Sequence, residues 1–190
     1  AKRFSREGYH AHLTRRTEED GLRKLISEIK NSGQSASGAL LNAVKENEIE
    51  DQVSYVEKNI GPIEVGVFNL GAQVGDRTLE DTPYKIFERG WRMATFALYR
   101  FSYSVIPHMV KRGGGAILVT ASTAAVRGNK EQHSHAAAMG ARRMLCQSLN
   151  AEFAPKGIHI VHIIIDGAVD APDTLGKMLG PKKFQELRET

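Results

Sequence analysis

The stretch from Gly115 to Phe153 constrains the fold of this chain more than any other. It begins with the apolar run Gly-Ala-Ile-Leu-Val-Thr-Ala, which ends at Ser122, and it continues through a polar loop into a long helix that opens near Ser134. An apolar run that ends in a hydroxyl side chain, followed by a loop and a helix, is typical of the βα unit of an open parallel sheet. Such sheets bind ligands at the carboxyl ends of their strands, where Ser122 lies.

The composition is that of an ordinary globular protein. The chain has 190 residues, of which 41% are hydrophobic and 25% charged, so we expect one domain over residues 1–190. Its 26 basic and 22 acidic residues give a net charge of +4, too small and too dispersed to imply a nucleic-acid partner. No run approaches the roughly 18 apolar residues that a membrane span needs. The single cysteine, Cys146, favours a reducing compartment, so we expect a cytoplasmic protein with a buried, inert thiol.

Strand and helix patterns alternate along the rest of the chain. Strands are predicted over 9–14, 37–44, 63–68 and 158–165. Helices are predicted to end near Gly8 and to cover 17–31, 46–59, 82–109 and 181–188, the second of them opening with a capping box at Thr17. This alternation predicts an α/β, Rossmann-like fold: a doubly wound parallel sheet with helices on both faces.

The helix predicted from Thr82 to about Met109 is apolar nearly all round. A surface helix shows one apolar stripe, whereas a helix of this kind needs two buried faces. We expect one face to pack on the sheet and the other on a second subunit, which gives a homodimer or homotetramer.

The seven histidines do not favour a metal site. Two closely spaced pairs point their side chains in different directions: His159 with His162, and His133 with His135. His10 and His12 share one face of a predicted strand, but no third ligand is evident in the sequence. We therefore predict no metal site.

The chain resembles the short-chain dehydrogenase/reductase family. The resemblance rests on the order of elements, the turn Asn69-Leu70-Gly71, Ser122 and the segment from Gly157 to Gly167, and it covers essentially the whole chain. It implies an NAD(P)-dependent oxidoreductase that acts on a small carbonyl or alcohol substrate. The family's Gly-rich TGxxxGxG turn, which holds the cofactor pyrophosphate, is absent. We therefore expect an N-terminal piece, which carries the family's first strand, to precede Ala1, and the family's closing strand to follow Thr190, so that residues 1–190 are a domain incomplete at both ends.

The catalytic residues of that family are only partly kept. Its serine matches Ser122, whereas its Tyr-x-x-x-Lys motif reads His135 and Met139, and its relay asparagine falls at Met93-Ala94. In the family the phenol protonates the carbonyl oxygen as hydride arrives, and the lysine lowers the phenol pKa and holds the ribose. A histidine can donate a proton near neutral pH, but a methionine supplies no charge. The chain is therefore either an oxidoreductase with a weakened site or a catalytically silent member that binds nucleotide or a partner.

The resemblance also implies a set of cofactor-binding residues. Arg15 follows a strand at the position where an acid selects NAD and an arginine selects NADP, so it favours NADP. A solvated basic turn explains Arg15 equally well. The other positions that match the family's cofactor site are Asn42, Asn69, Gly71, Met139, Asp166 and Gly167. The polar segment from Asp170 to Thr190 matches the family's substrate-covering region.

Overall fold

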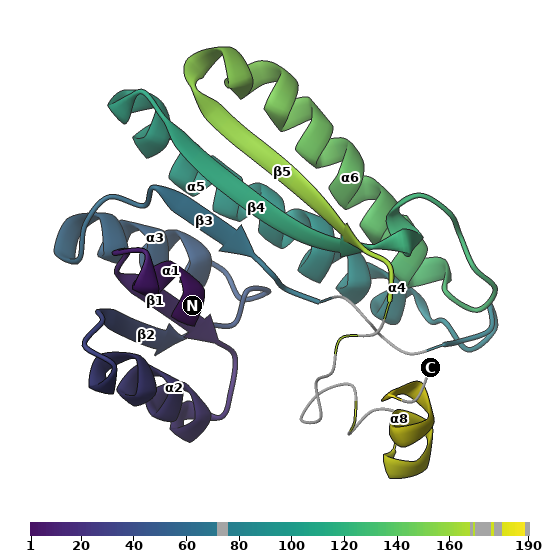
Figure 1. Cartoon of the computed structure of the whole chain (residues 1–190). Helices are drawn as coiled ribbons and strands as arrows, with labels where there is room; N and C mark the ends of the chain where they lie inside the picture. The colour runs from purple at the N-terminus through teal and green to yellow at the C-terminus, as the bar shows by residue number, and fades with distance from the viewer. Residues whose placement is uncertain (72–75, 168, 170–175, 177–179, 189–190) are drawn as a thin grey trace.

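The computed structural model describes residues 1–71, 76–167, 169, 176 and 180–188 (Figure 1). All described strands pair in parallel: β1 (Ala11–Arg15), β2 (Ala36–Leu40), β3 (Val65–Phe68), β4 (Gly115–Ser122) and β5 (Ile158–Ile165). The α-helices are α1 (Lys2–Arg6), α2 (Glu19–Asn31), α3 (Glu48–Asn59), α4 (Tyr84–Trp91), α5 (Ala97–Arg112), α6 (His133–Phe153) and α8 (Pro181–Arg188). The predicted α/β class is confirmed, and the chain order of strands and helices is as expected.

The strands lie in two sheets. β1 pairs with β2, and β4 lies between β3 and β5. A continuous sheet would need a further strand hydrogen-bonded to both β1 and β3, and the described part of the chain supplies none. The long strand β5 and helix α8 have the bounds that the sequence predicted. The ends of β1, β2 and β3 differ from the predicted ends by up to four residues.

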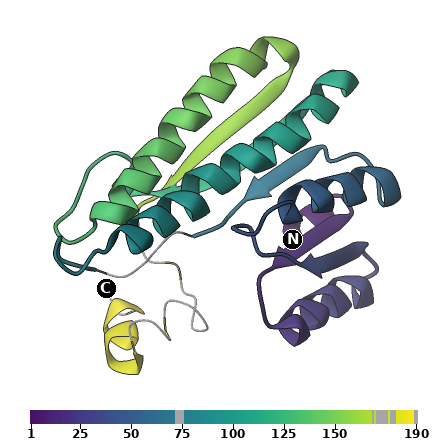
Figure 2. The same cartoon turned by 180° about the vertical axis from the view of Figure 1, so that it is seen from behind.

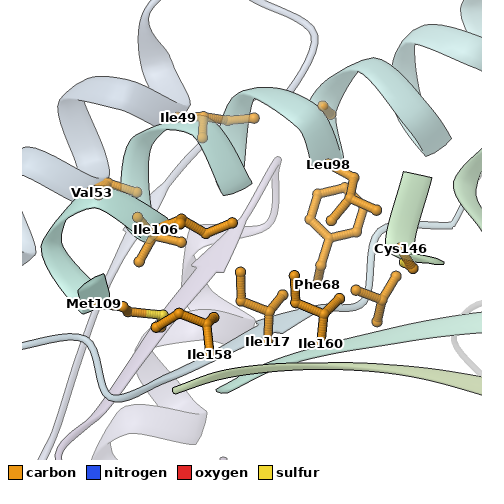
Figure 3. Close-up of a cluster of buried hydrophobic side chains, with 13 residues drawn as sticks. Ile49, Val53, Phe68, Leu98, Ile106, Met109, Ile117, Cys146, Ile158 and Ile160 are labelled. Carbon is orange, nitrogen blue, oxygen red and sulfur yellow. The ribbon is translucent and has the colours of Figure 1, made fainter. Parts of the chain in front are cut away.

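The main core lies between the three-stranded sheet and a layer made of α3, α5 and α6 (Figure 2). Side chains from all of these elements meet there, among them Ile49, Val53, Phe68, Leu98, Ile106, Met109, Ile117, Cys146, Ile158 and Ile160 (Figure 3). Burial raises the pKa of the Cys146 thiol to about 11, so that the thiol stays protonated. The expectation of a buried, unreactive cysteine is therefore supported.

The opposite face of the three-stranded sheet is open in Figure 1. Val67, Val161, Ile163 and Ile165 expose between 36% and 50% of their surface there. A second small core holds α2 against β1 and β2 through Ala11, Ile29 and Ala36. The expectation of helices on both faces is thus met around the β1–β2 sheet, while the described helices cover only one face of β3–β4–β5.

Two details of the helices differ from the prediction. The helix predicted over 82–109 runs as α4, a π-helical turn η1 (Arg92–Phe96) and α5. The capping box predicted at Thr17 is wrong, because α2 begins after Glu18 and no side chain caps it. Glu18 takes a left-handed conformation with φ of 62°, and its carboxylate pairs with Arg15 instead.

A two-pronged ion pair joins α3 to α5. Arg100 Nε donates to Glu50 Oε1 at 2.7 Å, and a terminal guanidinium nitrogen donates to Oε2 at 2.5 Å. The remaining terminal nitrogen donates to the carbonyl of Ala43 at 3.1 Å. The hydrogen bond to Arg100 is the main reason that the pKa of the Glu50 carboxyl is lowered.

Arg100→Met should lower the free energy of unfolding by about 1 kcal/mol near neutral pH, a modest value because Glu50 is 36% exposed and water screens the pair. Since the folded-state pKa of Glu50 is lowered, the pair stabilises the fold above the carboxyl's ordinary pKa of 4.5. Its contribution is lost as pH falls through the lower folded-state value. Urea titrations of both proteins at about pH 7 and about pH 3 measure the difference.

Arg23→Met is the matched control, because Arg23 pairs with Glu19 on the open surface of α2 and should contribute little. An equal loss of stability in Arg100→Met at both pH values would contradict the assignment to Glu50.

Candidate functional site

The residues predicted to form a site follow the carboxyl ends of the strands. Arg15 ends β1 and Asn42 lies just beyond β2, while Asn69, Ser122 and Asp166 lie at the ends of β3, β4 and β5. Because the strands of each sheet are parallel, these ends gather at one edge of each sheet. The sequence therefore placed the candidate residues at the edge where such folds bind ligands.

The centre of this edge is a pair of side chains from β4 and α6. Ser122 Oγ lies 3.1 Å from His135 Nε2, and both residues are half-buried. The serine comes from the last position of a strand, and the histidine from the first turn of the helix that follows. The arrangement places one hydroxyl and one imidazole where a single oxygen atom of a ligand can contact both.

Close packing of α4 against α6 holds His135 in place. Ser134 is 4% exposed, and its hydroxyl lies 3.4 Å from the carbonyl of Ile86 and 3.3 Å from that of Phe87. A Cβ atom on Gly90 would lie 2.4 Å from Ser134 Oγ, so the helices can approach this closely only because residue 90 has no side chain. The loops before the two helices are also tied, since Arg77 N donates to the Glu131 carbonyl at 2.8 Å.

Met139 lies one turn after His135 and faces the interior. It is 2% exposed and packs in a cluster of small side chains: Ala94, Ala121, Ala124, Ala125 and Ala138. This is how a packing residue is placed, and it supplies no charge to the edge of the sheet. A contact of Met139 with a cofactor remains a prediction.

Arg142 is a buried cation that the sequence analysis did not identify. The residue is 1% exposed, and its guanidinium donates to three carbonyl groups. Nε bonds Ala94 O at 2.9 Å, and the terminal nitrogens bond Thr120 O at 2.7 Å and Leu70 O at 2.8 Å. The guanidinium also lies 5.1 Å from the centre of the Phe68 ring.

Three segments of the chain are thus joined at Arg142: the turn after β3, the end of β4 and the π-helical turn. Burial lowers the pKa of the guanidinium to about 10, which leaves it charged at neutral pH. The sequence did carry a signal for the burial of Arg142. Residue 142 falls four positions after the buried Ala138 and four before the buried Cys146, so the three share one face of the helix.

The remaining predicted cofactor residues are near the surface and engage mainly local partners. Arg15 pairs with Glu18, and its guanidinium lies over Gly21 of α2. The backbone N–H of Asn42 donates to Glu48 Oε2 at 2.6 Å. Asn69 Oδ1 accepts a hydrogen bond from Thr120 Oγ1 at 2.6 Å. The three other predicted cofactor residues of this group, Gly71, Asp166 and Gly167, are exposed.

Half of the predicted substrate-covering segment after Asp170 lies outside the described residues, which there comprise Gly176 and the stretch over 180–188. Among the residues that the structure covers, there is no cluster of three or more histidine, cysteine or acidic side chains arranged to hold a metal ion. No helix in that same part of the chain is long and apolar enough to cross a membrane.

Comparisons with known proteins agree with this architecture. The family model described as short chain dehydrogenase matches residues 1–177. The chain is 27% identical over 168 residues to a 7alpha-hydroxysteroid dehydrogenase of Escherichia coli K12, an alignment that covers 88% of this chain. The chain spans only 64% of that relative's length.

Two solved structures of the same kind superpose closely. A short-chain dehydrogenase from Rhodopseudomonas palustris is 32% identical, has a TM-score of 0.83, and aligns with 90% of this chain and 78% of its own. A 7 alpha-hydroxysteroid dehydrogenase complexed with NADH and 7-oxo glycochenodeoxycholic acid is 25% identical, also has a TM-score of 0.83, and aligns with 91% of this chain and 66% of its own.

Arg142→Met should lower the free energy of unfolding by about 3 kcal/mol or more, because three carbonyl groups lose a buried donor. Arg142→Lys should give a smaller loss, since one ammonium keeps the charge but cannot reach all three oxygens. The neighbouring Arg143→Met is the control. Urea titration measures all three, and a stability of Arg142→Met within about 0.5 kcal/mol of the wild type would contradict the role given to Arg142.

Gly90→Ala should destabilise the protein by about 1–3 kcal/mol through overpacking, although alanine normally stabilises a helix relative to glycine. Adding Ser134→Ala should recover much of the loss, because the nearest remaining atoms of residue 134 would lie 3.6 Å from the new methyl group. Gly140→Ala in α6 is the matched control, since a Cβ there has open space. A Gly90→Ala protein as stable as the Gly140→Ala protein would show that the helices do not need this close approach.

Proposed function

Because this chain belongs to the short-chain dehydrogenase family, we propose that the intact protein is an NAD(P)-dependent oxidoreductase of carbonyl or alcohol substrates with a weakened catalytic site. The observation that carries the proposal is the 3.1 Å separation of Ser122 Oγ and His135 Nε2 at the carboxyl end of β4. In this proposal Ser122 binds the substrate oxygen, and His135 replaces the family's tyrosine as the proton donor.

The geometry suits a proton transfer to oxygen. A bound nicotinamide cofactor would supply or accept the hydride. In the direction of reduction, the Ser122 hydroxyl donates a hydrogen bond to the carbonyl oxygen and fixes its position. Protonated His135 then gives the proton on Nε2 to the oxygen as negative charge develops on it. In the direction of oxidation, neutral His135 takes that proton from the alcohol.

The site is proposed to be weak because position 139 supplies no cation to the proton donor. Met139 stands where the family has lysine, and it is buried among alanine side chains. The nearby guanidinium of Arg142 is committed to three carbonyl oxygens and does not replace that lysine. General acid catalysis typically contributes about 10²- to 10⁴-fold, which is the scale of what a poorly matched donor forfeits.

A catalytically silent protein that binds nucleotide or a partner is the second candidate. The apolar surroundings of Met139 favour it, since that position lacks a group for the ribose hydroxyls. The two candidates differ in turnover and not in fold. They are separated by the kinetics of the intact protein with its cofactor.

The proposed cofactor is NADP in preference to NAD, from the position of Arg15 after β1. Its pairing with Glu18 does not oppose this, because both side chains are substantially exposed and such pairs are weak. We also propose a homodimer or homotetramer in the cytoplasm. Trp91, Tyr99 and Tyr103, which are 42%, 47% and 72% exposed along α4 and α5, support the subunit interface.

His135→Gln should reduce the rate of NADPH-dependent carbonyl reduction by about 10²- to 10⁴-fold, because glutamine cannot release a proton. The wild-type pH–rate profile should break within about pH 5–8, where histidine titrates, and the break should vanish in the variant. The exposed neighbour His133→Gln is the control and should keep both rate and profile. Ser122→Ala should raise KM and lower kcat.

Turnover by the wild type that matches His135→Gln at every pH would reject the histidine as proton donor. Nucleotide binding without turnover in either protein would select the silent candidate.

Arg15→Asp should weaken binding of 2′,5′-ADP and leave binding of 5′-AMP nearly unchanged, because only the former presents a 2′-phosphate to residue 15. Fluorescence or calorimetric titration of the intact protein measures both nucleotides. Arg16→Asp is a control for loss of a neighbouring charge. Equal weakening of the two nucleotides, or of neither, would return Arg15 to the role of a solvated turn residue.

A further inference from the structure

Two histidines on the β1–β2 sheet aim nitrogen atoms at one point. His10 and His12 are two residues apart and face the same side of β1, opposite the small core under α2. Ser37 Oγ of β2 lies 2.7 Å from His10 Nε2 and 2.8 Å from His12 Nδ1. Two imidazole nitrogens and one hydroxyl oxygen therefore converge within hydrogen-bond distance, which the strand pattern of the sequence could not reveal.

The second nitrogen of each ring also has a partner. His10 Nδ1 lies 2.6 Å from Ser35 Oγ, and His12 Nε2 lies 3.0 Å from Nε2 of Gln52 on α3. A histidine that binds a metal ion almost always donates its other ring N–H to an oxygen, which fixes the ring and its tautomer. Ser35 offers such an oxygen as it stands. Gln52 offers one when its amide makes the half-turn that exchanges nitrogen and oxygen.

We propose that His10 Nε2 and His12 Nδ1 form a binding site for a divalent transition-metal ion such as Zn²⁺, Ni²⁺ or Cu²⁺. Imidazole nitrogen is a preferred ligand of all three ions. Ser37 Oγ is the third protein ligand, and water completes the coordination. Ser35 and Gln52 hold the two rings from behind.

The site is chemically separate from the Ser122–His135 pair, which lies on the other sheet. It joins β1 to β2 through the ligands and reaches α3 through Gln52. Binding of the ion would therefore stabilise this part of the fold by mass action, and the effect would be seen in thermal unfolding. Neither the proposed oxidoreductase activity nor a nucleotide is needed for this inference.

Calorimetric titration of the intact, chelator-treated protein with Zn²⁺, Ni²⁺ and Cu²⁺ tests the proposal. The expected result is one saturable site per chain for at least one of these ions, with an increase in Tm. His10→Asn should weaken that binding at least tenfold, and Gln52→Leu should weaken it about tenfold, as loss of an outer partner typically does. His159→Asn is the control and should bind like the wild type, because His159 is an exposed residue of β5 on the other sheet.

Two further measurements keep the test decisive. Ser37→Asp places a carboxylate at the convergence point and should bind at least tenfold more tightly, since a charged oxygen is a stronger ligand than a neutral hydroxyl. Electron paramagnetic resonance of the Cu²⁺ complex should show two equatorial nitrogens, falling to one in His10→Asn, whose side chain is exposed. Affinities weaker than about 1 mM for all three ions, or binding unchanged in His10→Asn, would overturn the proposal.

Discussion

The candidate site depends on one buried cation. Arg142 donates to the carbonyl oxygens of Leu70, Ala94 and Thr120, and these belong to three segments that are distant in sequence. Burial of the Arg142 charge costs free energy, because no carboxylate pairs with it in the described part of the structure. The three hydrogen bonds and the contact with the face of Phe68 offset that cost. Burial lowers the pKa of His162 on β5, and the positive charges of Arg142 and Arg143 lower it further. The three carbonyl groups and the Phe68 ring near the end of β4 are therefore arranged around the Arg142 side chain.

The second constraint is the distance between α4 and α6. Gly90 allows the first turn of α6 to press against α4, and Ser134 fills the contact with a buried hydroxyl. His135 follows Ser134 directly, so this contact fixes the backbone position from which the imidazole extends. Thr95 of the π-helical turn continues the contact through a 2.9 Å bond to the carbonyl of Ala138. The Ser122–His135 geometry is thus a product of helix packing, and not of the two residues alone.

Periodicity predicted the elements well where one local pattern dominated. The aliphatic run of β5 and the polar helix α8 gave the right bounds. The pairing of Ser122 with His135 was implied by the family resemblance and not by periodicity. Two features depend on contacts between distant segments and were out of reach: the burial of Arg142 and the convergence of His10 and His12 on Ser37. The capping box failed for a local reason, because Glu18 pairs with Arg15, three residues earlier, and no side chain caps α2.

The distribution of charge around α6 explains why fold and chemistry separate in this chain. Among the residues that the structure describes, Arg142 is the one charged side chain that is fully buried, and its hydrogen-bonding groups point at backbone oxygens. One turn earlier, Met139 occupies an apolar cluster in which an ammonium group would lack a partner. The helix therefore places the positive charge of Arg142 where it joins three segments, and Met139 adds no charge next to His135. A proton given or taken by His135 therefore has no assistance from a cation at position 139, which is the position where the family places its lysine.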